Sequence, residues 1–191
     1  MAVASERRAA AMMYAELRNF TRMSEALDPE KVLALANHFF ALVARCAAAH
    51  QGRPLGVQND SLAVLFAAAA PAVATARDLQ REFGPLGESW KISYGLPAAV
   101  AIGVHCGDVI LGMAGPPSGQ QFVAFGDCVS VAERLVHRAR AGEIVMSLEV
   151  MKALGPAVRE LGATELPALQ IPRRPPLPIY AIVLDTRLDF T

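Results

Sequence analysis

Two acidic residues stand where they could bind a divalent metal ion. Glu16 lies at the end of the mostly apolar run 9–17, and Asp60 lies in a polar turn just before the apolar run 62–66. Carboxylate oxygens are the hard ligands that Mg²⁺ and Mn²⁺ prefer, so two acids that converge from neighbouring strands could hold such ions. Spacing alone favours a plainer interpretation, in which Glu16 is a strand-end acid on the surface and Asp60 an ordinary turn residue.

A serine and an arginine form a second pair. Ser130 and Arg134 lie four residues apart in the segment 127–138, whose apolar positions predict a helix. Residues four apart share one face of a helix, and a guanidinium can bind phosphate oxygens bidentately. The alternative is that Arg134 is a solvated charge or part of a salt bridge, and that Ser130 is a plain residue of the first helical turn.

The composition argues against several classes of protein. The 191 residues carry 18 basic and 18 acidic side chains, so the formal net charge is zero, which argues against nucleic-acid binding by bulk charge. The three cysteines form no CxxC pair, which indicates a reducing compartment. No run reaches the ~20 apolar residues of a membrane-spanning helix, and charges at residues 6–8 argue against a signal peptide. We therefore expect a cytoplasmic protein with no membrane segment, or the cytoplasmic domain of a longer one.

The order of elements predicts an α+β fold. Asp28 and Pro29 mark the start of one helix, and the segment Cys106-Gly107-Asp108 is predicted to be a turn between two strands. We expect a single domain over residues 1–191, with its core at about 8–184, in which one mainly antiparallel sheet carries helices on one or both faces. The predicted strands are 9–17, 62–66, 97–105, 109–113, 122–125, 142–147 and 179–183, and a short segment before the turn 58–61 is predicted to form a β-hairpin with 62–66. The other predicted helices are 71–83, 127–138 (capped by Asp127) and 148–154, with loops at 84–89 and in the proline-rich stretch 167–178.

Five segments, in this order, resemble motifs of the class III adenylate and guanylate cyclase catalytic domains. They are Tyr14–Thr21 (YAELRNFT), Asn59–Phe66 (NDSLAVLF), Ile102–Val109 (IGVHCGDV), Phe125–Leu135 (FGDCVSVAERL) and Gly142–Ser147 (GEIVMS). The resemblance implies a ferredoxin-like (βαββαβ-type) sandwich that works as a head-to-tail dimer and uses Mg²⁺ or Mn²⁺. The reaction it implies is attack of a ribose 3′-oxygen on the α-phosphorus of ATP or GTP, which gives a 3′,5′-cyclic nucleotide and pyrophosphate.

The resemblance also implies roles for single residues. The family's two metal carboxylates fall at Glu16 and Asp60, and its transition-state Asn and Arg fall at Ser130 and Arg134. Asn19 stands where the family has glycine, and asparagine tolerates a left-handed backbone better than most residues. The backbone that would hold the triphosphate falls at Leu17, Arg18, Asn19, Phe20 and Thr21.

The positions that would recognise the base depart most from the family. Its base-reading lysine falls at Gly56, which has no side chain, and the partner position falls at Gln121, whose amide both donates and accepts. A further lysine that grips the outer phosphates has no counterpart, and Arg173 or Arg174 could take its place. One lost transition-state contact commonly costs ~10²–10³ in rate, so we predict weak or absent turnover by a homodimer.

Three functions follow from these observations. We predict a cyclase homology domain that serves as a regulatory, dimerisation or nucleotide-binding module. The alternative is an active adenylate or guanylate cyclase with an unusual site, either alone or in a heterodimer whose intact partner supplies the missing Lys and Asn. An unrelated ferredoxin-like binding domain is the third, and five ordered motifs argue against it.

Overall fold

A single eight-stranded sheet organises the chain. The computed structural model describes residues 5–184, and its strands follow the order β2-β3-β1-β4-β6-β8-β7, with β5 paired to the far end of β4. All neighbouring pairs are antiparallel except β4 and β6, so the predicted α+β fold class is confirmed. The strands are β1 (Glu6–Arg18), β2 (Arg53–Gln58), β3 (Ser61–Phe66), β4 (Ala99–Ala114), β5 (Gln121–Phe125), β6 (Glu143–Ser147), β7 (Thr164–Leu169) and β8 (Leu177–Val183).

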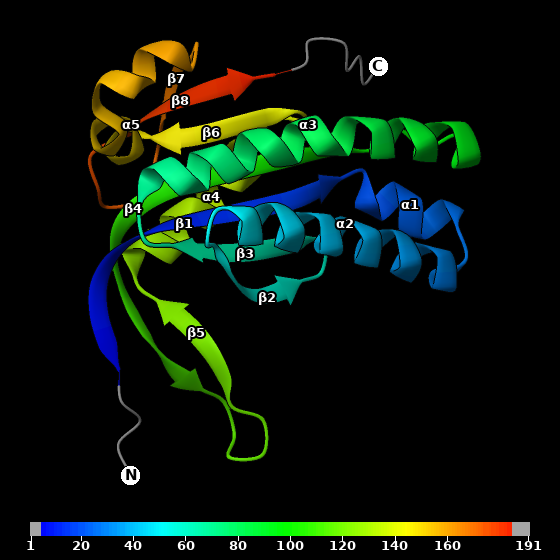
Figure 1. The fold of residues 1–191 in the computed structure, drawn as a ribbon, viewed down its shortest axis with the longest axis horizontal. Helices are drawn as coiled ribbons and strands as arrows, with labels where there is room; N and C mark the ends of the chain where they lie inside the picture. Colours follow the sequence, from blue (N-terminus) through cyan, green and yellow to red (C-terminus); the bar gives the residue numbers. More distant parts are fainter. Residues whose placement is uncertain (1–4, 185–191) are drawn as a thin grey trace.

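Helices cover both faces of this sheet (Figure 1). Because successive strand residues point to opposite faces, β1 contributes to two cores: Met13 and Leu17 pack under one group of helices, and Met12 and Tyr14 pack under the single helix on the other face. The first group comprises α1 (Phe20–Ala26), α2 (Pro29–Ala49), α3 (Ala69–Tyr94) and α5 (Leu148–Leu154), which a short 3₁₀ helix (Gly155–Glu160) follows; the single helix is α4 (Asp127–Arg138).

The predicted turn at Cys106-Gly107-Asp108 is wrong, because β4 runs through it as one strand of 16 residues. β1 pairs with β4 without a break from Glu6↔Leu111 to Arg18↔Ala99, and this pairing overrides the local turn preference. Gly107 serves another purpose: a Cβ there would lie 3.3 Å from the Cβ of Cys128 in α4. The glycine therefore permits a close approach of helix and sheet.

The predicted loop 84–89 is also wrong, because α3 continues through Gly84 and Pro85 to Tyr94. Proline removes one backbone hydrogen bond from a helix, but side chains on both sides of it are buried. Phe83, before the proline, packs edge to face against Phe39 of α2, with ring centroids 6.1 Å apart, and Trp90, after the proline, is buried in the same core. This tertiary packing keeps the helix intact past the proline. Three shorter elements were not predicted: α1, the 3₁₀ helix, and β7, part of which lies in the proline-rich stretch.

Helix α2 is a core helix. Among the described helices, it alone is long and apolar enough to cross a membrane by length and composition. Asp28 and Pro29 begin it as predicted, and its buried residues share the face that the sequence periodicity indicates. Those residues are Leu35, Ala36, Phe39, Leu42, Val43, Cys46 and Ala47.

Candidate active site

The two acids of the sequence analysis lie in one open pocket at the end of β1. Glu16 pairs with Ser61 in the β1–β3 ladder, which brings the preceding residue Asp60 beside it. The backbone closes the arrangement, since the Leu17 amide donates to the Asp60 carbonyl at 2.9 Å. The pocket has a volume of about 610 Å³ and is lined by Glu16, Leu17, Arg18, Asn19, Phe20, Thr21, Arg22, Glu25 and Asp60. The structure thus brings the two acids together with the predicted triphosphate backbone.

Glu16 is an acid held where burial disfavours its charge. It is 8% exposed, and burial raises the pKa of its carboxyl above the ordinary 4.5. The Arg18 guanidinium opposes this change in pKa, the nearby Asp60 carboxylate adds to it, and His137 opposes it more weakly. A carboxylate with a raised pKa beside a second acid is a typical position for a cation.

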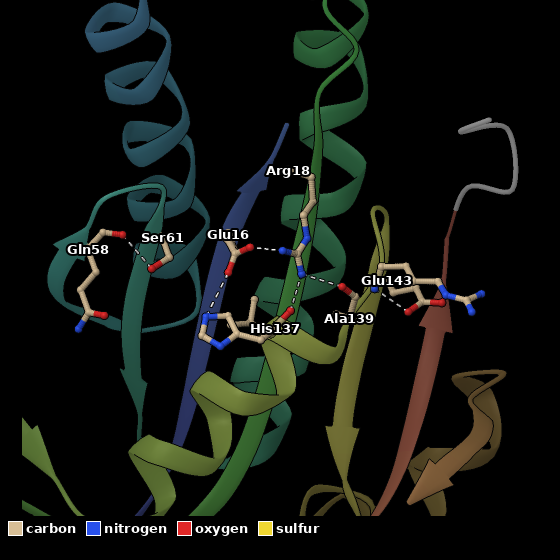
Figure 2. A network of polar contacts seen from close by, with 9 residues as sticks. Glu16, Arg18, Gln58, Ser61, His137, Ala139 and Glu143 are labelled. Carbon is tan, nitrogen blue, oxygen red and sulfur yellow. Dashed lines mark hydrogen bonds and ion pairs between the residues drawn. The ribbon is translucent and has the colours of Figure 1, made fainter. Parts of the chain in front are cut away.

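Two basic side chains already approach Glu16 in the chain itself (Figure 2). Arg18 contacts a Glu16 oxygen and also donates to the carbonyls of Val136 and Ala139 at the end of α4, each at 2.7 Å. His137 Nε2 lies 3.6 Å from the other Glu16 oxygen. The sequence motifs predict a role for the backbone of Arg18 alone and none for His137. The two-residue period of β1, which puts residues 16 and 18 on one face, was the available signal for Arg18.

The loop after β1 has the geometry that Asn19 predicts. Asn19 adopts a left-handed backbone with φ 67°, and its side-chain amide donates to the Pro97 carbonyl at 2.8 Å. Phe20 and Thr21 then form the first turn of α1. First-turn amides have no acceptor within their own helix, so N–H groups of this turn are free to face a ligand of the pocket.

Ser130 and Arg134 lie apart from this pocket, exposed on α4. Within residues 5–184 neither side chain forms a hydrogen bond or an ion pair. His137 is seven positions after Ser130 and shares its face of the helix. Ser130 and Arg134 share one face of α4, as their spacing of four residues predicts. In a single chain, however, they do not line the pocket of Glu16 and Asp60.

The two base-reading positions lie on neighbouring strands. Gly56 is exposed on β2, and a Cβ built on it would meet no atom within 4 Å. Gln121 is the exposed first residue of β5. It lies on the opposite face of β5 from Phe122, which packs against the core under α4.

Of the two arginines considered for the outer phosphates, Arg174 has another partner. It forms an ion pair with Asp127 at the start of α4, with N–O distances of 2.5 and 2.6 Å. This pairing lowers the pKa of the Asp127 carboxyl. Arg173 is exposed in the loop before β8. Asp127 itself is the first residue of α4, and the capping position is Gly126, so the predicted cap is wrong by one residue.

Comparison with known proteins agrees with this geometry. The model of the adenylate and guanylate cyclase catalytic domain matches residues 3–173. Adenylate cyclase 1 of Rhizobium meliloti (strain 1021) is 30% identical over 131 residues, which are 64% of this chain and 20% of that protein. An adenylate cyclase of Anabaena cylindrica is 26% identical over 138 residues, 69% of this chain and 28% of that protein. The match therefore spans less than a third of either curated relative.

Solved structures share the fold. The adenylyl cyclase CyaB from P. aeruginosa superposes with a TM-score of 0.86 at 22% identity, covering 98% of this chain and 100% of that one. The guanylyl cyclase Cya2 gives 0.86 at 23% identity, with 97% of each chain covered. The guanylate cyclase domain of RhGC from Catenaria anguillulae, solved in complex with GTP, gives 0.81 at 18% identity, covering 93% and 98%. The chain belongs to the adenylate and guanylate cyclase catalytic domain family, the class III nucleotide cyclases.

Proposed function

We propose that this chain is a cytoplasmic nucleotide-binding cyclase homology domain with weak or absent turnover as a homodimer. One observation carries the proposal: Glu16 and Asp60 share a pocket with the loop that would hold the triphosphate, whereas Gly56 leaves the base position empty. The half of the site that binds metal and phosphate is retained. The half that orients the base and stabilises the transition state is altered at Gly56 and Ser130.

The pocket fits Mg²⁺ or Mn²⁺ that arrives with a nucleotide. Within residues 5–184 no group of three His, Cys, Asp or Glu side chains could hold a metal by itself. Mg²⁺ needs only one or two carboxylates when phosphates and water supply its other ligands, and Glu16 and Asp60 meet that need. When bound, the ions would activate the ribose oxygen and neutralise charge on the phosphates.

The altered residues limit what the site can do. Ser130 is too short to replace the side-chain amide of Asn, and Gly56 offers no donor at all. Arg134 is retained, exposed and without a protein partner among the described residues, so it remains available to a phosphate. Effects within one site do not add, but each altered contact commonly costs ~10²–10³ in rate. This availability of Arg134 is what favours the alternative, an active cyclase.

We further propose that the chain dimerises, with itself or with an intact cyclase chain. The hairpin of β4 and β5 extends away from the helices (Figure 1) and exposes large apolar side chains. Ile110 and Phe125 pair directly across the hairpin and are 48% and 60% exposed, and neighbouring exposed apolar side chains are typical of protein interfaces. A dimer would also bring Ser130 and Arg134 on α4 of one chain to the pocket of Glu16 and Asp60 in the other chain.

The proposal is tested by measuring binding and turnover separately. Purified protein is titrated with a non-hydrolysable ATP or GTP analogue in Mn²⁺ by calorimetry and assayed for cyclic nucleotide with ATP or GTP. We expect binding that Asp60→Ala abolishes, with little product, while Glu88→Ala on the exposed face of α3 serves as the matched control. Robust product that disappears in Asp60→Ala would establish the active cyclase instead. Absence of nucleotide binding would leave only a dimerisation role.

A further inference from the structure

Arg53 is a cation on β2, three residues before Gly56, to which the motifs assign no role. Its guanidinium carbon lies 3.4 Å from the centroid of the Phe122 ring, a stacked cation–π contact between β2 and β5. Arg53 is exposed, and within residues 5–184 its guanidinium has no hydrogen-bond or ion-pair partner. Stacking fixes the plane of a guanidinium but leaves its in-plane N–H groups free. The N–H donors of Arg53 are therefore held in a fixed plane and have no acceptor among the described residues.

The register of β2 puts Arg53 on the same face of the sheet as Gly56. Arg53 pairs with Leu65 and Gly56 pairs with Ala63, and both partners belong to the core under α4. An irregularity between Pro54 and Gly56 absorbs the extra residue. Since Leu65 and Ala63 are two positions apart in β3, Arg53 and Gly56 are separated by roughly 7 Å along the strands. The open space beside Gly56 thus lies within reach of the Arg53 side chain.

We propose that Arg53 reads the nucleotide base and makes the site prefer guanine. A guanidinium carries donors only, so it recognises an edge that presents acceptors. Guanine presents two neighbouring acceptors, O6 and N7, whereas adenine presents N7 beside the N6 donor. Arg53 would act on the base directly, and Phe122 is a positioning residue that holds the guanidinium plane. This inference rests on the proposed function, because it requires a nucleoside triphosphate in the pocket of Glu16 and Asp60.

The same contact also joins β2 to β5, so a purely structural role has to be distinguished. A structural role would weaken the binding of every ligand or the stability of the fold. A base-reading role changes the preference between guanine and adenine and leaves the phosphate contacts alone. Inorganic tripolyphosphate, which has no base, separates the two.

The experiment compares four proteins in Mn²⁺ with non-hydrolysable GTP, non-hydrolysable ATP and tripolyphosphate. They are the wild type, Arg53→Ala, Arg53→Lys and the control Arg159→Ala, which removes an exposed arginine of the 3₁₀ helix. A bidentate contact discriminates between bases by roughly five- to 150-fold. We expect the wild type to prefer GTP by that factor, Arg53→Ala to lose the preference, and Arg53→Lys to lose most of it because lysine lacks the planar fork. Tripolyphosphate affinity should be equal in all four.

Two results would overturn the inference. An unchanged GTP-to-ATP ratio in Arg53→Ala, with nucleotide binding retained, refutes the role of Arg53 and leaves the proposed function standing. Failure of the wild type to bind either nucleotide or tripolyphosphate refutes the proposed function itself, and the role of Arg53 with it.

Discussion

Gly103 sets how closely α4 approaches the sheet. It lies in β4 between two paired strands, opposite Tyr14 of β1 and Val145 of β6. A Cβ at this position would lie 2.3 Å from the Val136 amide nitrogen and 2.6 Å from the Ala132 carbonyl oxygen. Both are backbone atoms of α4, so no change of rotamer can relieve the contact. The substitution Gly103→Ala must therefore move the helix.

The size of the effect follows from that geometry. Carbon atoms pack at about 3.5–4.0 Å, so α4 has to move away by roughly 1 Å. Overpacking of a well-packed core costs typically ~1–3 kcal/mol. For a chain of this size 1 kcal/mol lowers the melting temperature by about 2–4 °C, which predicts a decrease of about 2–12 °C. The displacement should also lower nucleotide affinity, because the last carbonyls of α4 hold Arg18 beside Glu16.

The measurement is thermal and urea unfolding followed by the fluorescence of the buried Trp90. Gly56→Ala is the matched control for stability, because its new Cβ meets open space. Its melting temperature should be unchanged or slightly higher, as expected for a glycine replaced without strain. If Gly103→Ala melts at the wild-type temperature, the close approach of α4 to β4 is wrong, and so is the positioning of Arg18 by this helix.

Two further predictions concern buried titratable groups. Burial raises the pKa of Glu16, so its charged form costs folding free energy at pH values above the ordinary pKa. Glu16→Gln should therefore melt at or above the wild-type temperature at pH 7, yet lose the Mn²⁺ binding that electron paramagnetic resonance measures. A Glu16→Gln variant that still binds Mn²⁺ would contradict this prediction. Burial lowers the pKa of His105 below its ordinary 6.5, and its Nδ1 lies 2.7 Å from Ser147 Oγ. The unfolded chain therefore takes up the proton first, so stability present above pH 6.5 is lost as the pH falls through the folded pKa. Between about pH 7 and about pH 5, the melting temperature of His105→Gln should fall by less than that of the wild type. The control His38→Gln, at an exposed site of α2, should show the same fall as the wild type.

Local patterns predict the fold where side-chain periodicity and burial agree. The apolar face of α2 and the buried strand at the apolar run of β1 both follow from the sequence alone. The errors occur at a glycine and at a proline, whose local preferences indicate a turn and a helix end but which here lie inside a strand and a helix. Gly107 indicates a turn, but the β1–β4 ladder continues through it. Pro85 indicates a helix end, but the burial of Phe83 against Phe39 of α2 and of Trp90 in the same core carries α3 further. In both cases distant contacts outweigh local preference.

The same distinction applies to the candidate site. Glu16, Asp60 and the loop after β1 were predicted because each lies in a contiguous motif and a hairpin register brings them together. The contact of Arg53 with Phe122 was not predicted, since it joins β2 to a strand almost seventy residues later in the sequence. The approach of His137 to Glu16 depends likewise on how α4 crosses the sheet. Such contacts become visible only once the elements are placed.

The candidate site residues include groups that stability alone would not select. A carboxylate at position 16 is 8% exposed, and burial works against its charge; a neutral side chain would remove that cost. Arg134 is an exposed charged side chain with no hydrogen-bond or ion-pair partner within residues 5–184. Residues that break local rules without a structural benefit are characteristic of functional sites. Gly56, by contrast, breaks no rule and simply leaves space. In the function that we propose, the acids of the metal and phosphate half therefore cost stability, whereas the base half depends on residues such as Arg53.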